Sequence, residues 1–291
     1  MTGQLLLYKY HGLGNDFLIH DASETAVSGD QAQKLLDRNR GIGADGLLNL
    51  FRQNSNDNLK MELFNADGSV AEMSGNGLRC FAHCAFLLGF KSTEPFQVET
   101  GAGMRRVQII GNQENKLCVT VDQEMGSVTI QRADGTLKAI VEETLERMAL
   151  DSWIVDVGNP HLVVFVKNLE IFNDSYLEKV GNYLSTSMQS GVNVEFVVSQ
   201  GETCQMVVYE RGVGITQACG TGSVAIAAAS RESERSGDVI SVCNPGGELM
   251  VSLEGDRASM RGPSSYVAEI SVPYESEVLK GTMFGAQFDA Y

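Results

Sequence analysis

Cys219 begins a Cys-Gly-Thr-Gly motif that leads into an apolar segment, residues 222–231, which is predicted to be a buried helix. The two glycines allow backbone N–H groups to approach a ligand closely. The free N–H groups and the dipole of a helix's first turn favour an anion there, and they are expected to lower the pKa of a thiol at that end. The motif therefore predicts a Cys219 thiolate beside a pocket for a carboxylate.

A second motif of the same kind, Ser74-Gly-Asn-Gly, leads into another apolar segment, residues 77–89. Ser74 and Cys219 lie 145 positions apart, which is half of the 291-residue chain. Nine positions before each of them, a polar residue ends a predicted strand: Asn65 in the first half and Glu210 in the second. This pattern predicts one structural unit used twice, with its two copies facing each other.

Two helix N-termini that point at one site could hold a single carboxylate from both sides and stabilise charge that develops on it. Removal of the α-proton of an amino acid without a cofactor needs such stabilisation. Two acid/base groups on opposite faces would invert the centre, because one removes the proton and the other returns it.

Seven segments in order resemble the diaminopimelate epimerase family, over about residues 9 to 263. They are YHGLGNDF (10–17), NRGIGADG (39–46), FNADGSVAEMSGNGLRC (64–80), ETGAG (99–103), VGNPH (157–161), GVNVEF (191–196) and YERGVGITQACGTG (209–222). The resemblance implies cofactor-independent epimerisation of LL-diaminopimelate to meso-diaminopimelate, in lysine and peptidoglycan-precursor biosynthesis. It also implies an α+β fold of two pseudo-symmetric domains, each a curled β-sheet or barrel around a central helix, with the active site between them.

The resemblance assigns roles to individual residues. Cys219 is expected to be one of two catalytic thiols, and His161 is expected to lie near the reacting groups. The main-chain amides of Gly75, Asn76, Gly220 and Thr221 are expected to hold the reacting carboxylate. The remaining substrate-binding residues are expected to be Asn15, Asn65, Asn159, Asn193, Glu210 and Arg211. The guanidinium of Arg211 suits a carboxylate, and the carboxylate of Glu210 suits an ammonium group.

Ser74 stands where the family has its second catalytic cysteine. A free thiol has a pKa of about 8.5, whereas a serine hydroxyl is far less acidic and is a poor base toward an α-proton. Cys80 does not replace the missing thiol, because it lies further along the helix and should point into the core. Three interpretations stay open: an engineered change, a natural variant that is slow or one-directional, or a relative with altered chemistry.

The elements that must position these residues are predicted mainly as strands, which are bounded by Gly, Asn or Asp between residues 5 and 212. Besides the two buried helices, residues 29–39 and 141–150 are predicted to be helical. We expect one domain of residues 1–120 plus a returning segment, 265–291, and a second domain of residues 121–264. For the segment from about residue 274, the sequence leaves two alternatives open, an interface arm or a disordered tail.

Composition excludes several classes of protein. Lys and Arg number 22 against 37 Asp and Glu, and a net charge of −15 repels nucleic acid. No apolar run is long enough for a membrane helix, and no secretory signal is evident. The six cysteines are expected to be reduced thiols in a cytoplasmic protein, with Cys80 and Cys84 in the core. No motif indicates a metal or another cofactor.

Three functions from different classes therefore remain. The first is an isomerase with diaminopimelate as its small-molecule partner, impaired or one-sided because of Ser74. The second is a related racemase or dehydratase acting on another amino acid, and the third is a non-catalytic amino-acid-binding relative. The intact set of Asn65, Asn193, Glu210 and Arg211 favours the first. A homodimer is left open.

Overall fold

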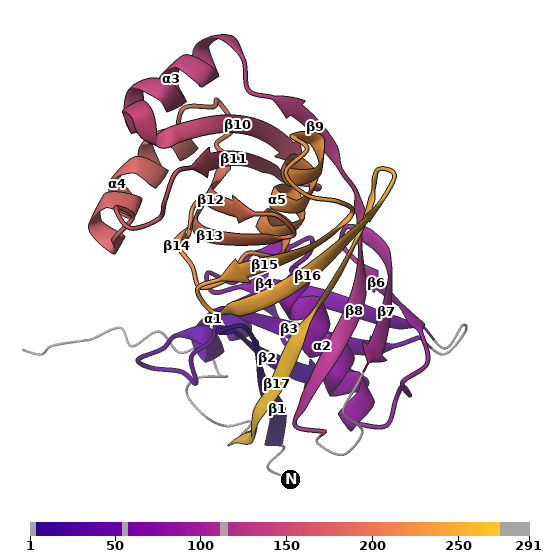
Figure 1. Ribbon diagram of the computed structural model, residues 1–291. Coiled ribbons are helices and arrows are strands. Elements are labelled where there is room, and N and C mark those ends of the chain that lie inside the picture. Colours follow the sequence, from indigo (N-terminus) through magenta and orange to yellow (C-terminus); the bar gives the residue numbers. More distant parts are fainter. Residues whose placement is uncertain (1–3, 54–57, 111–115, 274–291) are drawn as a thin grey trace, which may run out of the picture.

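The computed structural model describes residues 4–53, 58–110 and 116–273. Two runs of elements follow one another in the same order (Figure 1). The first run consists of β1 (Gln4–Gly12), β2 (Asn15–Asp21), α1 (Gly29–Leu36), β3 (Gly46–Arg52), β4 (Leu59–Asn65), β5 (Val70–Ala71), α2 (Gly75–Leu87), β6 (Phe96–Thr100), β7 (Gly103–Ile110) and β8 (Cys118–Ser127). The second consists of β10 (Ala149–Asp156), β11 (Pro160–Val166), α4 (Asp174–Ser185), β12 (Asn193–Gln200), β13 (Thr203–Glu210), β14 (Gly214–Ile215), α5 (Gly220–Glu232), β15 (Val239–Asn244), β16 (Gly247–Glu254) and β17 (Arg257–Pro273). Between the two runs lie β9 (Thr129–Arg132), α3 (Gly135–Leu145) and a short 3₁₀ turn, Glu146–Met148.

The strand pairing of the two runs is also the same. In the first, β2 pairs parallel with β3 and β4 pairs parallel with β6, while the other neighbours are antiparallel. In the second, β11 pairs parallel with β12 and β13 pairs parallel with β15, again among antiparallel neighbours. The repeat predicted from the two glycine motifs is therefore confirmed, element by element, as a mixed α+β fold with barrel-like sheets.

Each run of strands surrounds one helix. The side chains of α2 form a hydrophobic cluster with β1–β4 and β6–β8, and those of α5 form a second cluster with β10–β13 and β15–β17. Both helices are apolar on nearly every side, as expected for a helix without a solvent face. Cys80 and Cys84 of α2 are fully buried in the first cluster, so their prediction as core thiols is confirmed.

The other helices lie outside the curled strands and begin at side-chain caps or in the linker. Ser28 and Gln31 form a capping box at the start of α1, and Asn173 caps α4. The predicted helix at residues 141–150 is wrong in its limits. The helix α3 begins earlier, at Gly135, and ends at Leu145, because the chain from Ala149 onward pairs in β10 with β9 and β11.

The last strand, β17, connects the two runs. Residues 257–261 of β17 pair with β16, residues 257–265 pair with β8, and residues 265–273 pair with β1. The chain therefore returns to its beginning from residue 265, while residues 274–291 lie outside the described part. Within that part, no helix is long and apolar enough to cross a membrane.

Candidate active site

The two glycine motifs form the first turns of α2 and α5, and these turns are in contact. A Cβ atom built on Gly220 would lie 3.7 Å from the Cα atom of Gly75. The same Cβ would lie 3.0 Å from the Cε atom of Met260, and a Cβ on Gly75 would lie 3.2 Å from that atom. The glycines thus let the two helix starts meet above one methionine side chain of β17.

Ser74 and Cys219 are the N-cap residues of these helices. The backbone N–H of Gly77 donates to Ser74 Oγ at 3.0 Å, and that of Gly222 donates to Cys219 Sγ at 3.3 Å. The N–H groups just after each cap have no acceptor within their own helix, because helix geometry leaves the first turn unpaired. On α2 and α5 they belong to the motif residues Gly75, Asn76, Gly220 and Thr221. Two sets of first-turn amides, a geometry that favours an anion, therefore begin at adjacent points.

The environment of the Cys219 thiol is the reverse of the one predicted from the sequence. Burial raises the pKa of Cys219 well above its usual range, and the carboxylates of Glu210 and Glu195 raise it further. The bonds from Thr221 and from the Gly222 amide lower it, but by less. The placement at a helix N-terminus is as expected, whereas the expected fall in pKa is wrong. Burial and the two carboxylates therefore favour the thiol form of Cys219 over the thiolate.

A chain of polar contacts connects Glu195 to Cys219. His161 is fully buried on β11, and its Nδ1 lies 2.6 Å from Oε1 of the fully buried Glu195. Its Nε2 lies 3.1 Å from Oδ1 of Asn159, whose amide donates to Thr221 Oγ1 at 3.4 Å. The Thr221 hydroxyl is 3.6 Å from Cys219 Sγ. The structure thus brings His161, Asn159 and Thr221 together with the candidate catalytic thiol.

Glu210 and Arg211 end β13 and begin the turn that follows. The hydroxyl of Thr216 donates to the Glu210 carboxylate, and burial raises the pKa of Glu210. The exposed guanidinium of Arg211 donates to the carbonyl of Ser190 at 2.7 Å, and its backbone N–H donates to Asn193 Oδ1 at 2.9 Å. Asn193 and Arg211 therefore belong to one hydrogen-bonded cluster of the second half.

The asparagines of the first half are positioned differently from one another. The Asn76 side chain donates to Asn15 Oδ1 at 3.1 Å and to the carbonyl of Ala218 at 3.2 Å, so it joins the first half to the residue before Cys219. Asn65 is exposed at the end of β4, and its side chain donates to Ser69 within its own turn at 3.0 Å. The side-chain contact of Asn65 therefore stays within its own turn.

Three residues of the site were not among the predicted ones. Glu195 pairs with His161, Asn244 accepts the backbone N–H of Cys219 at 3.2 Å, and Arg79 donates to Asn76 Oδ1 at 2.6 Å. Glu195 and Arg79 carried a signal, since each is a single charge within an apolar segment, and a buried charge needs a partner. Asn244 lies at the end of a strand, where polar residues are common, and carried none.

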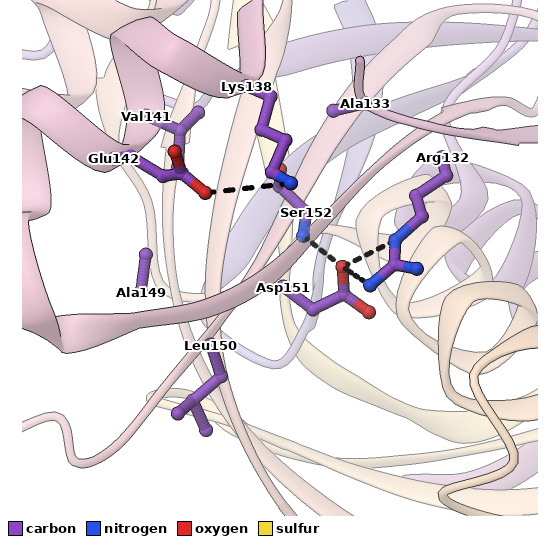
Figure 2. Close-up of a pocket in the computed structure, with 9 residues that line it drawn as sticks. All are labelled: Arg132, Ala133, Lys138, Val141, Glu142, Ala149, Leu150, Asp151 and Ser152. Atoms are coloured by element: carbon purple, nitrogen blue, oxygen red, sulfur yellow. Dashed lines mark hydrogen bonds and ion pairs between the residues drawn. The ribbon is translucent and has the colours of Figure 1, made fainter.

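The pocket drawn in Figure 2 lies elsewhere, between α3 and β10, and has a volume of about 90 Å³. Its cations are paired with carboxylates, Arg132 with Asp151 and Lys138 with Glu142, and none of the predicted site residues lines it. Among the residues that the structure describes, no group of three or more His, Cys, Asp or Glu side chains is placed to hold a metal ion.

Comparison with solved structures defines the class of fold. The chain superposes on a hydroxyproline epimerase from Agrobacterium vitis with a TM-score of 0.71 and 15% identity, covering 96% of this chain and 95% of that one. It superposes on a PhzF-family phenazine biosynthesis protein from Bacillus anthracis with a TM-score of 0.70 and 16% identity, covering 93% and 99%. The fold is thus of the type shared by PhzF proteins and amino-acid epimerases.

Comparison of sequences identifies the family. The family model described as diaminopimelate epimerase matches residues 7–131 and 153–267. A diaminopimelate epimerase from Desulfitobacterium hafniense is 35% identical over 277 residues, which cover 90% of this chain and 95% of that protein. The chain therefore belongs to the diaminopimelate epimerase family and is an isomerase, as its motifs predicted.

Proposed function

We propose that this protein interconverts LL- and meso-diaminopimelate without a cofactor, as a step of lysine and peptidoglycan-precursor biosynthesis. The observation that carries the proposal is the contact between the starts of α2 and α5, with Ser74 and Cys219 as their N-caps. Backbone amides at both starts would bind the carboxylate of the reacting centre and stabilise the charge that develops when the α-proton leaves.

In this proposal Cys219 begins as a thiol and is the proton donor on its face of the substrate. To act as a base, the thiol must first lose its proton to a neighbour. Glu210 is suited to accept that proton, because it is hydrogen-bonded to Cys219 and burial already raises its pKa. The positively charged amino group of the substrate would then offset the negative charge of the thiolate and the carboxylates.

On the opposite face, the group at the matching position is the Ser74 hydroxyl. It can donate a hydrogen bond or a proton, but it removes an α-proton far less readily than a thiolate does. We therefore propose that epimerisation is slow or one-sided. Proton removal from the Cys219 face would be efficient, and proton transfer on the Ser74 face would limit the full reaction.

The distal end of the substrate would be held by the residues at the mouth of the site. Asn65, Asn193 and Arg211 offer amide and guanidinium groups to a second amino-acid centre, while Glu210, beside Cys219, stays with the reacting centre. Arg211 would have to leave the Ser190 carbonyl to reach a carboxylate, and a bidentate pair would replace that single bond. Asn15, Asn159 and His161 would line the reacting end, next to the carboxylate-binding amides.

We also propose that the two repeats act as two domains. One would comprise residues 1–120 with the segment from 265 onward, and the other residues 121–264. The pairing of residues 265–273 with β1 supports the return of the chain to the first domain. The predicted homodimer and cytoplasmic location stay predictions, to be tested by measurement of the mass in solution and by cell fractionation.

The test is exchange of the α-hydrogen in deuterated water, followed by mass spectrometry and NMR on LL- and meso-diaminopimelate separately. We expect rapid incorporation of deuterium from one isomer and slow formation of the other. Loss of water or release of a keto acid during the same time course would favour a dehydratase instead. Tight binding of diaminopimelate with no exchange from either isomer would favour a non-catalytic binding protein.

A further inference from the structure

Arg79, on the second turn of α2, is a buried cation without a carboxylate partner. Its side chain is fully buried, and its Nε, Nη1 and Nη2 atoms donate to Pro263 O at 3.2 Å, Gly75 O at 3.3 Å and Asn76 Oδ1 at 2.6 Å. No ion pair joins it to a carboxylate of the described residues. Burial lowers its pKa to about 10, which leaves it charged at neutral pH.

The surrounding strands leave space for this guanidinium at two glycines. A Cβ atom on Gly12 of β1 would lie 3.1 Å from Arg79 Nη2, and one on Gly262 of β17 would lie 2.3 Å from Leu249 Cδ2 and 3.1 Å from Arg79 Nε. A buried charge without a counter-ion is costly. A fold that encloses this charge with hydrogen bonds and no carboxylate leaves its positive potential available to a nearby anion.

The atoms that Arg79 holds belong to the carboxylate-binding turn itself. Gly75 and Asn76 contribute the free amides at the start of α2, and Arg79 donates to the carbonyl of one and the side chain of the other. With its oxygen bound to Arg79, Asn76 directs its Nδ2 to Asn15 Oδ1 and to the carbonyl of Ala218. Arg79 therefore fixes a side chain that connects the start of α2 to the residue before Cys219.

The charge distribution across the two halves is asymmetric. The position of α5 that matches Arg79 in the repeat is Val224, an apolar residue. The second half instead places two carboxylates, Glu195 and Glu210, close to Cys219. A substrate between the helix starts thus has a buried positive charge behind the Ser74 side and negative charges around the Cys219 side. This arrangement matches an amino acid that presents its carboxylate to α2 and its ammonium group to the second half.

We propose that Arg79 is a positioning residue of the carboxylate site. The substrate carboxylate, bound at the amides of Gly75 and Asn76, acts as the counter-ion of Arg79. The guanidinium also fixes the Asn76 side chain. This proposal rests on the proposed function, since it takes the carboxylate of an amino acid as the ligand. One unit charge at about a helical turn's distance, in a partly shielded site, is expected to change affinity roughly ten- to hundredfold.

The test compares Arg79→Gln and Arg79→Lys with the unaltered protein, and uses Arg231→Gln as the matched control. Arg231 lies in the last turn of α5, pairs with Asp238 at 3.5 Å and is remote from the helix starts. Calorimetry with meso-diaminopimelate gives the dissociation constant, deuterium exchange gives the turnover of bound substrate, and thermal unfolding reports stability. We expect Arg79→Gln to weaken binding roughly ten- to hundredfold and Arg79→Lys to weaken it by less than about threefold. The control should match the unaltered protein.

Each contrary outcome is informative. Equal affinity of Arg79→Gln and the unaltered protein would overturn the role of Arg79 and leave the proposed function intact. Equal losses of affinity in the glutamine and lysine variants would show that the positive charge does not act on the ligand, and failure of both variants to fold would assign Arg79 to stability; either result would overturn the proposal. Failure of the unaltered protein to bind or exchange meso-diaminopimelate would instead contradict the proposed function, on which this inference depends.

Discussion

Replacement of Ser74 by cysteine is the most direct test of what limits this enzyme. Ser74 Oγ accepts the Gly77 amide at 3.0 Å, and Cys219 Sγ accepts the corresponding amide at 3.3 Å, so a thiol at position 74 would occupy an N-cap of the same geometry. A well-placed acid/base group contributes about 10²- to 10⁴-fold to a proton transfer. We expect epimerisation of LL- to meso-diaminopimelate to rise by about that factor in Ser74→Cys.

The structure also predicts how Ser74→Cys changes the stability of the fold and the exchange on the Cys219 face. Sulfur is a weaker acceptor than the hydroxyl oxygen that caps α2, so the free energy of unfolding should fall by about 1 kcal/mol or less. Deuterium exchange from the isomer that presents its α-hydrogen to Cys219 should stay within about twofold, because that face is unchanged. Ser74→Ala is the control, and it should abolish the remaining slow epimerisation while it leaves the Cys219-face exchange measurable.

The assay measures the amounts of LL- and meso-diaminopimelate over time by chiral chromatography. Deuterium exchange is measured in the same samples. The reasoning would be refuted if Ser74→Cys epimerised no faster than the unaltered protein while it remained folded. It would also be refuted if both isomers already exchanged at equal rates with serine in place. Either result would mean that the group at position 74 is not the acid/base residue of its face.

Three further predictions concern the rest of the site and the core. Glu210→Gln should lower the pKa of Cys219, since it removes a neighbouring carboxylate, and the midpoint of the pH profile for alkylation of Cys219 should move to lower pH. Gly222→Ala should reduce stability by about 1–3 kcal/mol and impair exchange, because the new Cβ would lie 2.6 Å from Glu195 Oε1. Gly237→Ala is the control, because its new Cβ would lie 3.8 Å from the nearest atom. It should change neither the stability in thermal unfolding nor the rate in exchange assays. Burial raises the pKa of the two core thiols of α2 from 9.0 to about 12, so the folded state keeps protons that the unfolded chain has released. Stability in urea should therefore be full below pH 9 and fall by about 1.4 kcal/mol per pH unit for each thiol above it, and replacing both by alanine should flatten the fall.

The repeat could be predicted from the sequence because its signals are local. Glycine motifs before two apolar segments determine where α2 and α5 begin, and strand ends at Asn65 and Glu210 follow from turn residues. The last three strands, β15, β16 and β17, were not predicted, although much of them alternates between buried and exposed residues as strands do. Their pairing depends on partners far away in the chain, such as β8 and β1.

The sequence indicated which residues lie at the starts of α2 and α5, but it did not indicate the electrostatics around Cys219. A helix N-terminus alone argues for a low thiol pKa at Cys219, and that argument is correct for an exposed helix end. Here burial and the carboxylates of Glu195 and Glu210 outweigh it. The contribution of Glu195 depends on a tertiary contact, since β12 runs parallel to β11 and places Asn193 opposite His161. Spacing along the chain does not reveal that register.

The path of β17 has a consequence for how the chain acquires its structure during synthesis. The first strand to leave the ribosome, β1, finds one of its two neighbours only in residues 265–273, near the far end of the described chain. Contacts between such distant segments slow folding, because a long loop must close before they form. We therefore expect the N-terminal half to remain incompletely folded, with one edge of β1 unpaired, until residues 265–273 have emerged from the ribosome. A chain that stops before residue 265 would leave that edge open to pairing with other chains, as edge strands are prone to do.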